Sequence, residues 1–143
     1  MSLPETPAPR LPDGWAATLG LEITHVSADE IRAEWTVDGR HLQPFGIVHG
    51  GVHASVVETL CSMGAAESAR RDGLVVVGLE NHTSFLRAVR SGRLRAVARP
   101  VHAGRRAQLW RTEITDEKGR LVATGTVRLL ALDPAAAGAG GGE

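Results

Sequence analysis

The chain has 143 residues, of which 43% are hydrophobic and 22% are charged, and these values are typical of one ordinary soluble domain with a sizeable core. The formal net charge is zero, so nothing draws the whole molecule toward nucleic acid or a membrane surface. No apolar run approaches the roughly 18 residues of a membrane helix, the N-terminus lacks the regions of a signal peptide, and the single cysteine, Cys61, excludes an internal disulfide. We therefore expect a cytoplasmic protein that binds neither nucleic acid nor membrane.

The chain divides into one domain and two tails. Residues 1–13 hold four prolines and little that could pack, so we expect a flexible arm there, with a short helix or turn near 15–19. The domain is expected over 14–132. The low-complexity tail, 133–143, is expected to be disordered.

Within the domain, the pattern predicts two strands, one long helix and then four strands. Apolar and polar residues alternate in several of the strand segments, whereas residues 52–66 contain one acid and no Lys or Arg, which is typical of a helix wrapped by the rest of a domain. The expected helix is 51–71, and the expected strands are 21–25, 30–37, 74–79 leading into 81–85, 93–102, 108–115 and 121–132. Tight turns between the later strands indicate an antiparallel sheet, so the fold class is α+β, with a curved sheet around one helix.

Gly50 and Gly51 stand where this helix begins. Amides in the first turn of a helix lack intrahelical acceptors, and glycine lets a ligand approach the backbone closely. The positive end of the helix dipole points to the same place, so the pair suits a carbonyl oxygen that gains negative charge. The alternative is that the glycines only form a tight turn.

Glu58 is the one acid of the apolar run. A carboxylate in such surroundings is costly unless it is satisfied or used, so it is either catalytic or part of a structural ion pair. It lies too far along the helix to reach the amides of its own chain, which favours a site shared between two subunits. Ser62, one turn later, could hold a water or orient the carboxylate.

Two other groups of side chains allow more than one interpretation. His49 and His53 are four residues apart and His41 is nearby, but the HExxH pattern is absent, so we expect no metal and assign His49 to shaping the loop. Residues 81–112 contain no acid, and their basic side chains could face the phosphates of a nucleotide or simply be solvated. These side chains are Arg87, Arg90, Arg93, Arg95, Arg99, Arg105, Arg106 and Arg111.

Three segments together resemble a known family. GIVHGGVHASVVETL, ENHTSFLRAVRSGRLRAVARPVHAG and KGRLVATGTV are similar to hot-dog-fold acyl-CoA thioesterases, most closely to the hydroxybenzoyl-CoA branch with its catalytic carboxylate on the central helix, with the phenylacetate-pathway enzymes as near relatives. The resemblance covers about residues 20–132. It implies a long helix enclosed by a curved antiparallel sheet of about six strands, in subunits that pair and then form tetramers.

The resemblance also assigns roles to residues. It implies that Glu58 is the catalyst, that the Gly50 amide polarises the acyl carbonyl, and that Gln43 and Ser62 assist. The candidate substrate-binding residues are His49, Gly51, Asn81, Thr83, Arg87, Arg105 and Arg106. Arg87 matches an arginine that meets CoA phosphates, whereas Arg105 and Arg106 replace small hydroxyl residues of the relatives.

The function expected from these residues is hydrolysis of an acyl-CoA to a free acid and CoA, without a cofactor. Glu58 acts either as a nucleophile or as a general base, and both roles stay open. Two other functions are also open, a non-catalytic acyl-CoA sensor and a hot-dog dehydratase that uses His49 and Glu58. The acyl group is open too, from aryl and aryl-acetyl to short or medium aliphatic chains.

Overall fold

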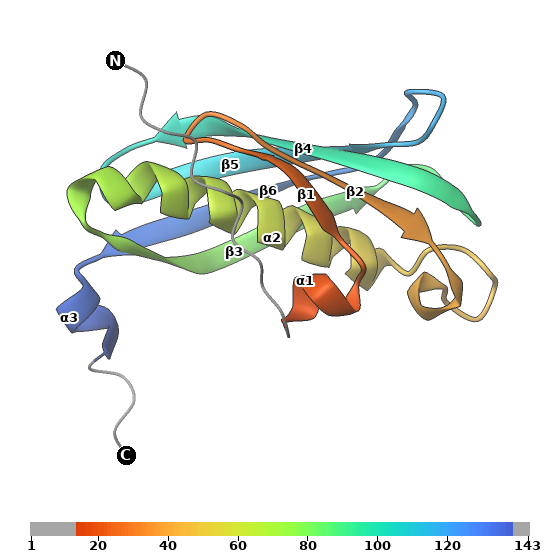
Figure 1. Ribbon diagram of the computed structural model, residues 1–143, viewed down its shortest axis with the longest axis horizontal. Helices are drawn as coiled ribbons and strands as arrows, with labels where there is room; N and C mark the ends of the chain where they lie inside the picture. The colour runs from red at the N-terminus through yellow and green to blue at the C-terminus, as the bar shows by residue number, and fades with distance from the viewer. Residues whose placement is uncertain (1–13, 139–143) are drawn as a thin grey trace.

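One long helix lies against a single six-stranded sheet in the computed structural model, which describes residues 14–138 (Figure 1). The helix follows two strands and precedes four, as the sequence predicts. The helices are α1 (Trp15–Thr18), α2 (Gly50–Ala69) and α3 (Pro134–Ala137), the 3-10 turns are η1 (Gly39–His41) and η2 (Arg70–Asp72), and the strands are β1 (Glu22–Val26), β2 (Ile31–Val37), β3 (Val75–Phe85), β4 (Gly92–Ala103), β5 (Ala107–Thr115) and β6 (Leu121–Leu132). The arm expected at 1–13 lies outside the described residues.

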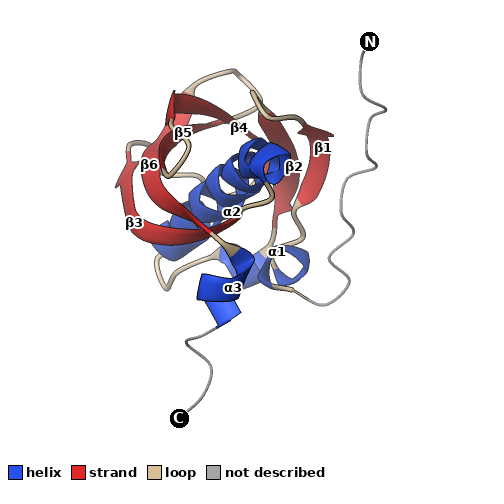
Figure 2. Ribbon diagram, turned by 90° about the vertical axis from the view of Figure 1, so that its left-hand side faces the viewer, coloured by secondary structure: helices blue, strands red, loops and turns tan. Residues whose placement is uncertain are grey.

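The sheet curls around α2, as the view along the helix shows (Figure 2). Its strands pair antiparallel in the order β1-β2-β4-β5-β6-β3. The helix packs on the inner face, and Gly64 permits a close approach because a side chain there would collide with the ring of Trp110. Trp110 and Leu60 are completely buried in this contact region, so the sheet and α2 share one core.

Three details differ from the expectations. Helix α2 ends at Ala69 rather than Arg71, because the chain tightens into η2 and then turns at Gly73, whose φ of 66° favours glycine. The tail, expected to be disordered from residue 133, begins with α3, where Asp133 caps the Ala135 N–H at 3.0 Å. Helix α2 is also not wrapped on every side, since Glu58 and Ser62 are only half-buried.

The open side of α2 lies beside β3, which is an edge strand of the sheet. No residue of β3 is buried, and three of its apolar side chains, Val77, Leu79 and Phe85, are exposed by 40%, 54% and 58%. A long edge strand with exposed apolar side chains is suited to pairing with another chain. Within residues 14–138, no helix is long and apolar enough to cross a membrane.

Candidate active site

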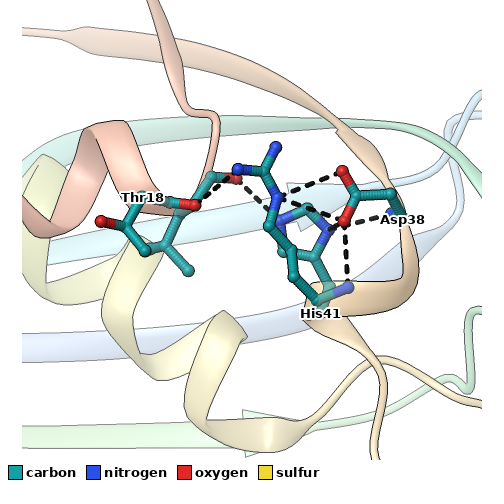
Figure 3. A network of polar contacts seen from close by, with 5 residues as sticks. Thr18, Asp38 and His41 are labelled. Carbon is teal, nitrogen blue, oxygen red and sulfur yellow. Dashed lines mark hydrogen bonds and ion pairs between the residues drawn. The ribbon is translucent and has the colours of Figure 1, made fainter.

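The loop before α2 is fixed by a polar network centred on His41, which is 1% exposed (Figure 3). His41 Nε2 lies 2.7 Å from the Leu19 carbonyl oxygen, and its Nδ1 accepts from the Asp38 N–H at 3.0 Å. Because a backbone N–H can only donate, Nδ1 is the bare nitrogen and Nε2 carries the proton. Arg40 joins Asp38 to the Thr18 carbonyl, so α1, β2 and the loop are held as one unit.

The first helical turn of α2 leaves one amide free. His49 is the N-cap residue, and its Nδ1 accepts the Gly51 N–H at 2.8 Å. The Gly50 N–H has no acceptor within residues 14–138. Of the two glycine amides, Gly50 is therefore the one available to polarise a carbonyl oxygen, and Gly51 keeps His49 in place.

A pocket of about 270 Å³ opens at this end of the helix, and its lining includes Gln43, Gly50, His53, Phe85 and Arg87. The Phe85 ring covers the helix start, since a Cβ on Gly50 would lie 2.7 Å from its Cε2 and Cζ atoms. The Gln43 Oε1 accepts the Phe45 N–H. The side-chain NH₂ group of Gln43 therefore points away from the Phe45 amide and is free to donate to another acceptor. We call Gln43, Gly50, His53 and Phe85 the Gly50 end.

The carboxylate of Glu58 has its own partners further along the helix. Asn81 Nδ2 donates to Glu58 Oε2 at 3.0 Å and to the Ala54 carbonyl at 3.0 Å. The Thr83 hydroxyl donates to Asn81 Oδ1 at 2.6 Å, which fixes the orientation of that amide. A Cβ on Gly78 would lie 2.7 Å from Glu58 Oε1, so a side chain at position 78 would displace the carboxylate. We call Glu58, Asn81, Thr83 and Gly78 the Glu58 end.

The two ends do not meet within one chain. Gly50 and Glu58 are eight residues apart, which is about 12 Å along a helix. No ion pair to Glu58 is found within residues 14–138, and no hydrogen bond joins it to Ser62 in that part of the chain. The carboxylate is held by an amide rather than neutralised by an arginine.

Seven of the eight arginines within residues 81–112 fall into two groups. Arg93 contacts Glu22 and Glu34 at 2.7 and 2.8 Å, and its hydrogen bond lowers the pKa of Glu34; Arg95 and Arg99 pair with Glu34 and Glu30. These three are therefore paired with acids of β1, of β2 and of the turn just before β2, and the side chains of Arg95 and Arg99 remain exposed. Arg87, Arg105, Arg106 and Arg111 make no ion pair within residues 14–138.

Arg87 and the pair Arg105 and Arg106 lie at opposite ends of α2. Arg87 lines the pocket beside Gly50, whereas Arg105 and Arg106 occupy the β4–β5 turn, near the C-terminal end of the helix, where Gln108 contacts the Ala65 carbonyl (Figure 1). One chain therefore cannot bring all three side chains to a single ligand at Gly50.

Two residues of the site are not expected from the sequence in these roles. His53 enters the sequence interpretation only as a partner for His49 in a metal site, yet no three His, Cys, Asp or Glu side chains gather to hold a metal within residues 14–138. Phe85 lies within the NHTSFxR motif, but nothing in that motif shows that its ring reaches Gly50. The alternation of Asn81, Thr83 and Phe85 on one face of a strand is the signal that could have found it.

Comparison with known proteins places this chain in a family. The family model of the thioesterase superfamily matches residues 45–123. A protein of Mycobacterium tuberculosis with the provisional name of an esterase is 41% identical over 133 residues, which is 91% of this chain and 95% of that protein. The proofreading thioesterase EntH of Cronobacter turicensis is 46% identical over 106 residues, covering 74% of this chain and 77% of the relative.

The solved structures agree. The structure of the M. tuberculosis protein superposes with a TM-score of 0.80 at 43% identity, covering 82% of this chain and 94% of that one. A thioesterase of Haemophilus influenzae gives a TM-score of 0.77 at 37% identity, with 82% and 81% covered. The expected α+β fold, a curved antiparallel sheet around a central helix, is thus confirmed, and the chain belongs to the thioesterase superfamily of hot-dog proteins.

Proposed function

We propose that the protein is an acyl-CoA thioesterase whose site is completed by a second copy of the chain, as a cytoplasmic enzyme without a cofactor. The observation that carries the proposal is the separation of two reactive groups along α2, a free amide at Gly50 and a positioned carboxylate at Glu58. Thioester hydrolysis needs both a donor for the carbonyl oxygen and a nucleophile or base for the carbonyl carbon.

A twofold axis beside β3 brings these groups together. Asn81 bonds the Ala54 carbonyl, and residue 54 lies midway between positions 50 and 58. If two β3 strands pair antiparallel with the axis near Asn81, the partner's Glu58 comes level with Gly50 of this chain. The unburied edge of β3 supports such pairing. The family resemblance further suggests that two dimers form a tetramer.

The same axis brings the three candidate phosphate-binding arginines to one end of the site. Arg87 lies at the mouth of the pocket, and the partner's Arg105 and the partner's Arg106 come to the same end of the helix, because the two copies of α2 run in opposite directions. All three then suit the phosphates of CoA, while the acyl end enters the pocket.

In the proposed reaction, the Gly50 N–H and the NH₂ group of Gln43 bind the acyl carbonyl. The partner's Glu58 either attacks the acyl carbon, with release of the CoA thiolate and later hydrolysis of the anhydride, or takes a proton from a water that attacks instead. Ser62 sits one turn after Glu58 and supports that water. Asn81 holds the carboxylate in one rotamer.

The test is thiol release from a panel of acyl-CoA esters by the wild-type protein and by Glu58→Gln. We expect hydrolysis by the wild type and a loss of kcat of at least about 10³-fold in the variant, with binding of the esters retained. Binding without thiol release in the wild type would indicate a sensor. Enoyl absorbance without thiol release would indicate a dehydratase. A Glu58→Gln variant as fast as the wild type would remove Glu58 from the mechanism.

A further inference from the structure

His53 is a buried imidazole without a complete set of partners. It is 3% exposed, it lines the pocket beside Gly50, and its Nδ1 is buried with no hydrogen-bond partner within residues 14–138. Its ring centroid lies 6.2 Å from that of Phe85, which contributes no polar atom. Leaving a buried polar atom unpaired is destabilising, so such an atom at a pocket wall calls for an explanation.

Within the same part of the chain, the only other such side-chain atom is Trp35 Nε1. Trp35 is 1% exposed and belongs to the core cluster, where no ligand can reach it. His53 differs because it lies at a pocket. The unpaired nitrogen is therefore placed where a bound molecule could satisfy it.

The charge state of the ring restricts which polar group of a bound molecule can form a hydrogen bond with His53. Burial lowers the pKa of His53 to about 4, so the imidazole is neutral near pH 7 and has one N–H donor and one bare acceptor nitrogen. A neutral ring suits a hydroxyl or keto oxygen. It gives no ionic compensation to a buried carboxylate, which would be costly there.

The position of the ring decides which part of the substrate it meets. His53 follows Gly50 by three residues on the same side of α2, about 4.5 Å along the axis. Leu86 and Arg87 at the pocket are exposed, whereas His53 and Val48 are buried, so His53 lies at the inner end. CoA is far too large for about 270 Å³, and only an acyl group can reach this depth.

Resting on the proposed thioesterase function, we propose that His53 is a specificity-determining residue that hydrogen-bonds a neutral oxygen substituent near the thioester carbon of the acyl group. The preferred substrates are then acyl-CoA esters with a hydroxyl or keto oxygen close to the carbonyl. Plain hydrocarbon chains of the same length leave the imidazole unpaired, and acyl groups that end in a carboxylate are excluded.

The test compares kcat/KM for 3-hydroxybutyryl-CoA, butyryl-CoA and succinyl-CoA with the wild type, His53→Leu and His53→Gln. We expect the wild type to favour 3-hydroxybutyryl-CoA over butyryl-CoA by about tenfold or more, and succinyl-CoA to be the poorest of the three. In His53→Leu the ratio of the first two esters should fall to about one, whatever the absolute rates. His53→Gln, which keeps a polar group, should retain part of the ratio.

An equal ratio in the wild type and His53→Leu, or a wild type that favours butyryl-CoA, would overturn this role while leaving the thioesterase function intact. Failure to hydrolyse any ester would instead overturn the proposed function. If His53→Leu does not fold, the imidazole ¹⁵N shifts of inactive Glu58→Gln protein report the contact directly. They should change more with 3-hydroxybutyryl-CoA than with butyryl-CoA, and identical changes with both esters would refute the hydrogen bond.

Discussion

The Gly50 end and the Glu58 end of α2 differ in whether their polar groups already have partners. At the Gly50 end, an amide and an imidazole nitrogen are unpaired within residues 14–138. At the Glu58 end, the carboxylate is held by Asn81, which is itself held by Thr83. Unpaired polar groups form their hydrogen bonds only when a ligand binds and so contribute to its affinity. Groups that are already paired are held in place before the ligand arrives. Under the proposed function, this difference assigns recognition of the acyl group to the Gly50 end and a fixed reactant to the Glu58 end.

After the loss of Glu58 itself, the largest expected effect comes from deleting the free amide with Gly50→Pro. Position 50 is the first residue of the helix, where proline is well tolerated, and His49 has ψ 135°, which suits a residue before proline. We expect kcat to fall by about 10²–10³-fold, measured by thiol release.

Gly50→Ala is the matched control for this variant. Both substitutions place a Cβ against the half-exposed Phe85 ring, but alanine keeps the N–H. Equal losses in the two variants would mean that crowding by Phe85, and not the missing donor, causes the effect.

Mixing two inactive variants tests whether the two ends of one site come from different chains. Gly50→Pro and Glu58→Gln protein, unfolded together and refolded, should form mixed dimers with one intact site each. Random pairing predicts recovery of about a quarter of the wild-type activity. Mixtures that stay as inactive as the separate variants, although mass analysis shows mixed dimers, would place both groups in one chain.

The unpaired imidazole of the Gly50 end should make stability depend on pH. The pKa of His53 falls from 6.5 to about 4 on folding, so between these values the unfolded chain binds more protons and acid favours unfolding. Above about pH 6.5 the ring is neutral in both states and the protein keeps its full free energy of unfolding. About 3 kcal/mol of that free energy is lost as the pH falls toward 4.

Urea titrations at pH 7 and pH 4.5 measure this loss, with His53→Leu as the reference. Carboxylates such as Glu34 and Asp116, whose pKa values are lowered by hydrogen bonds from arginines, add their own acid sensitivity to both proteins. Only the difference between the proteins reports His53. An identical loss in both would show that the ring is protonated as easily in the folded state as in the unfolded one.

The sequence predicts the elements that carry the two ends, but not the contacts between side chains from different elements. The helix, the strands and the separation of Gly50 from Glu58 follow from local patterns, because periodicity and turn pairs are properties of neighbouring residues. The partners do not. Asn81 meets Glu58 across 23 positions, and Glu34 stands opposite Arg95 only because β2 pairs with β4. His53 resembles a metal ligand in the sequence because the spacing shows the shared helix but not the pocket.

A smaller effect is expected when the Glu58 end loses its positioning residue. Asn81→Asp keeps the size of the side chain but replaces the donor to Glu58 with an acid, so kcat should fall by about tenfold or more with little change in KM. Thr83→Val removes only the group that orients Asn81 and should cost less. Ser84→Ala, in the same strand but beside His82 and Arg111 in another hollow, is the control. A rise in KM at constant kcat would mean that Asn81 contacts the substrate instead.

The smallest effect concerns Cys61, one turn from Glu58 but turned into the core. Burial raises the pKa of its thiol to about 12, and the hydrogen bond with Thr112, which lowers the pKa, offsets only part of this effect. Because the thiolate is the reactive form, a thiol reagent should not label the folded protein and should label one site after denaturation. The enzyme then adds no background to a thiol-release assay. Rapid labelling of the folded protein would show that the Glu58 end opens far enough to expose the core beneath it. Such opening is incompatible with a preorganised carboxylate.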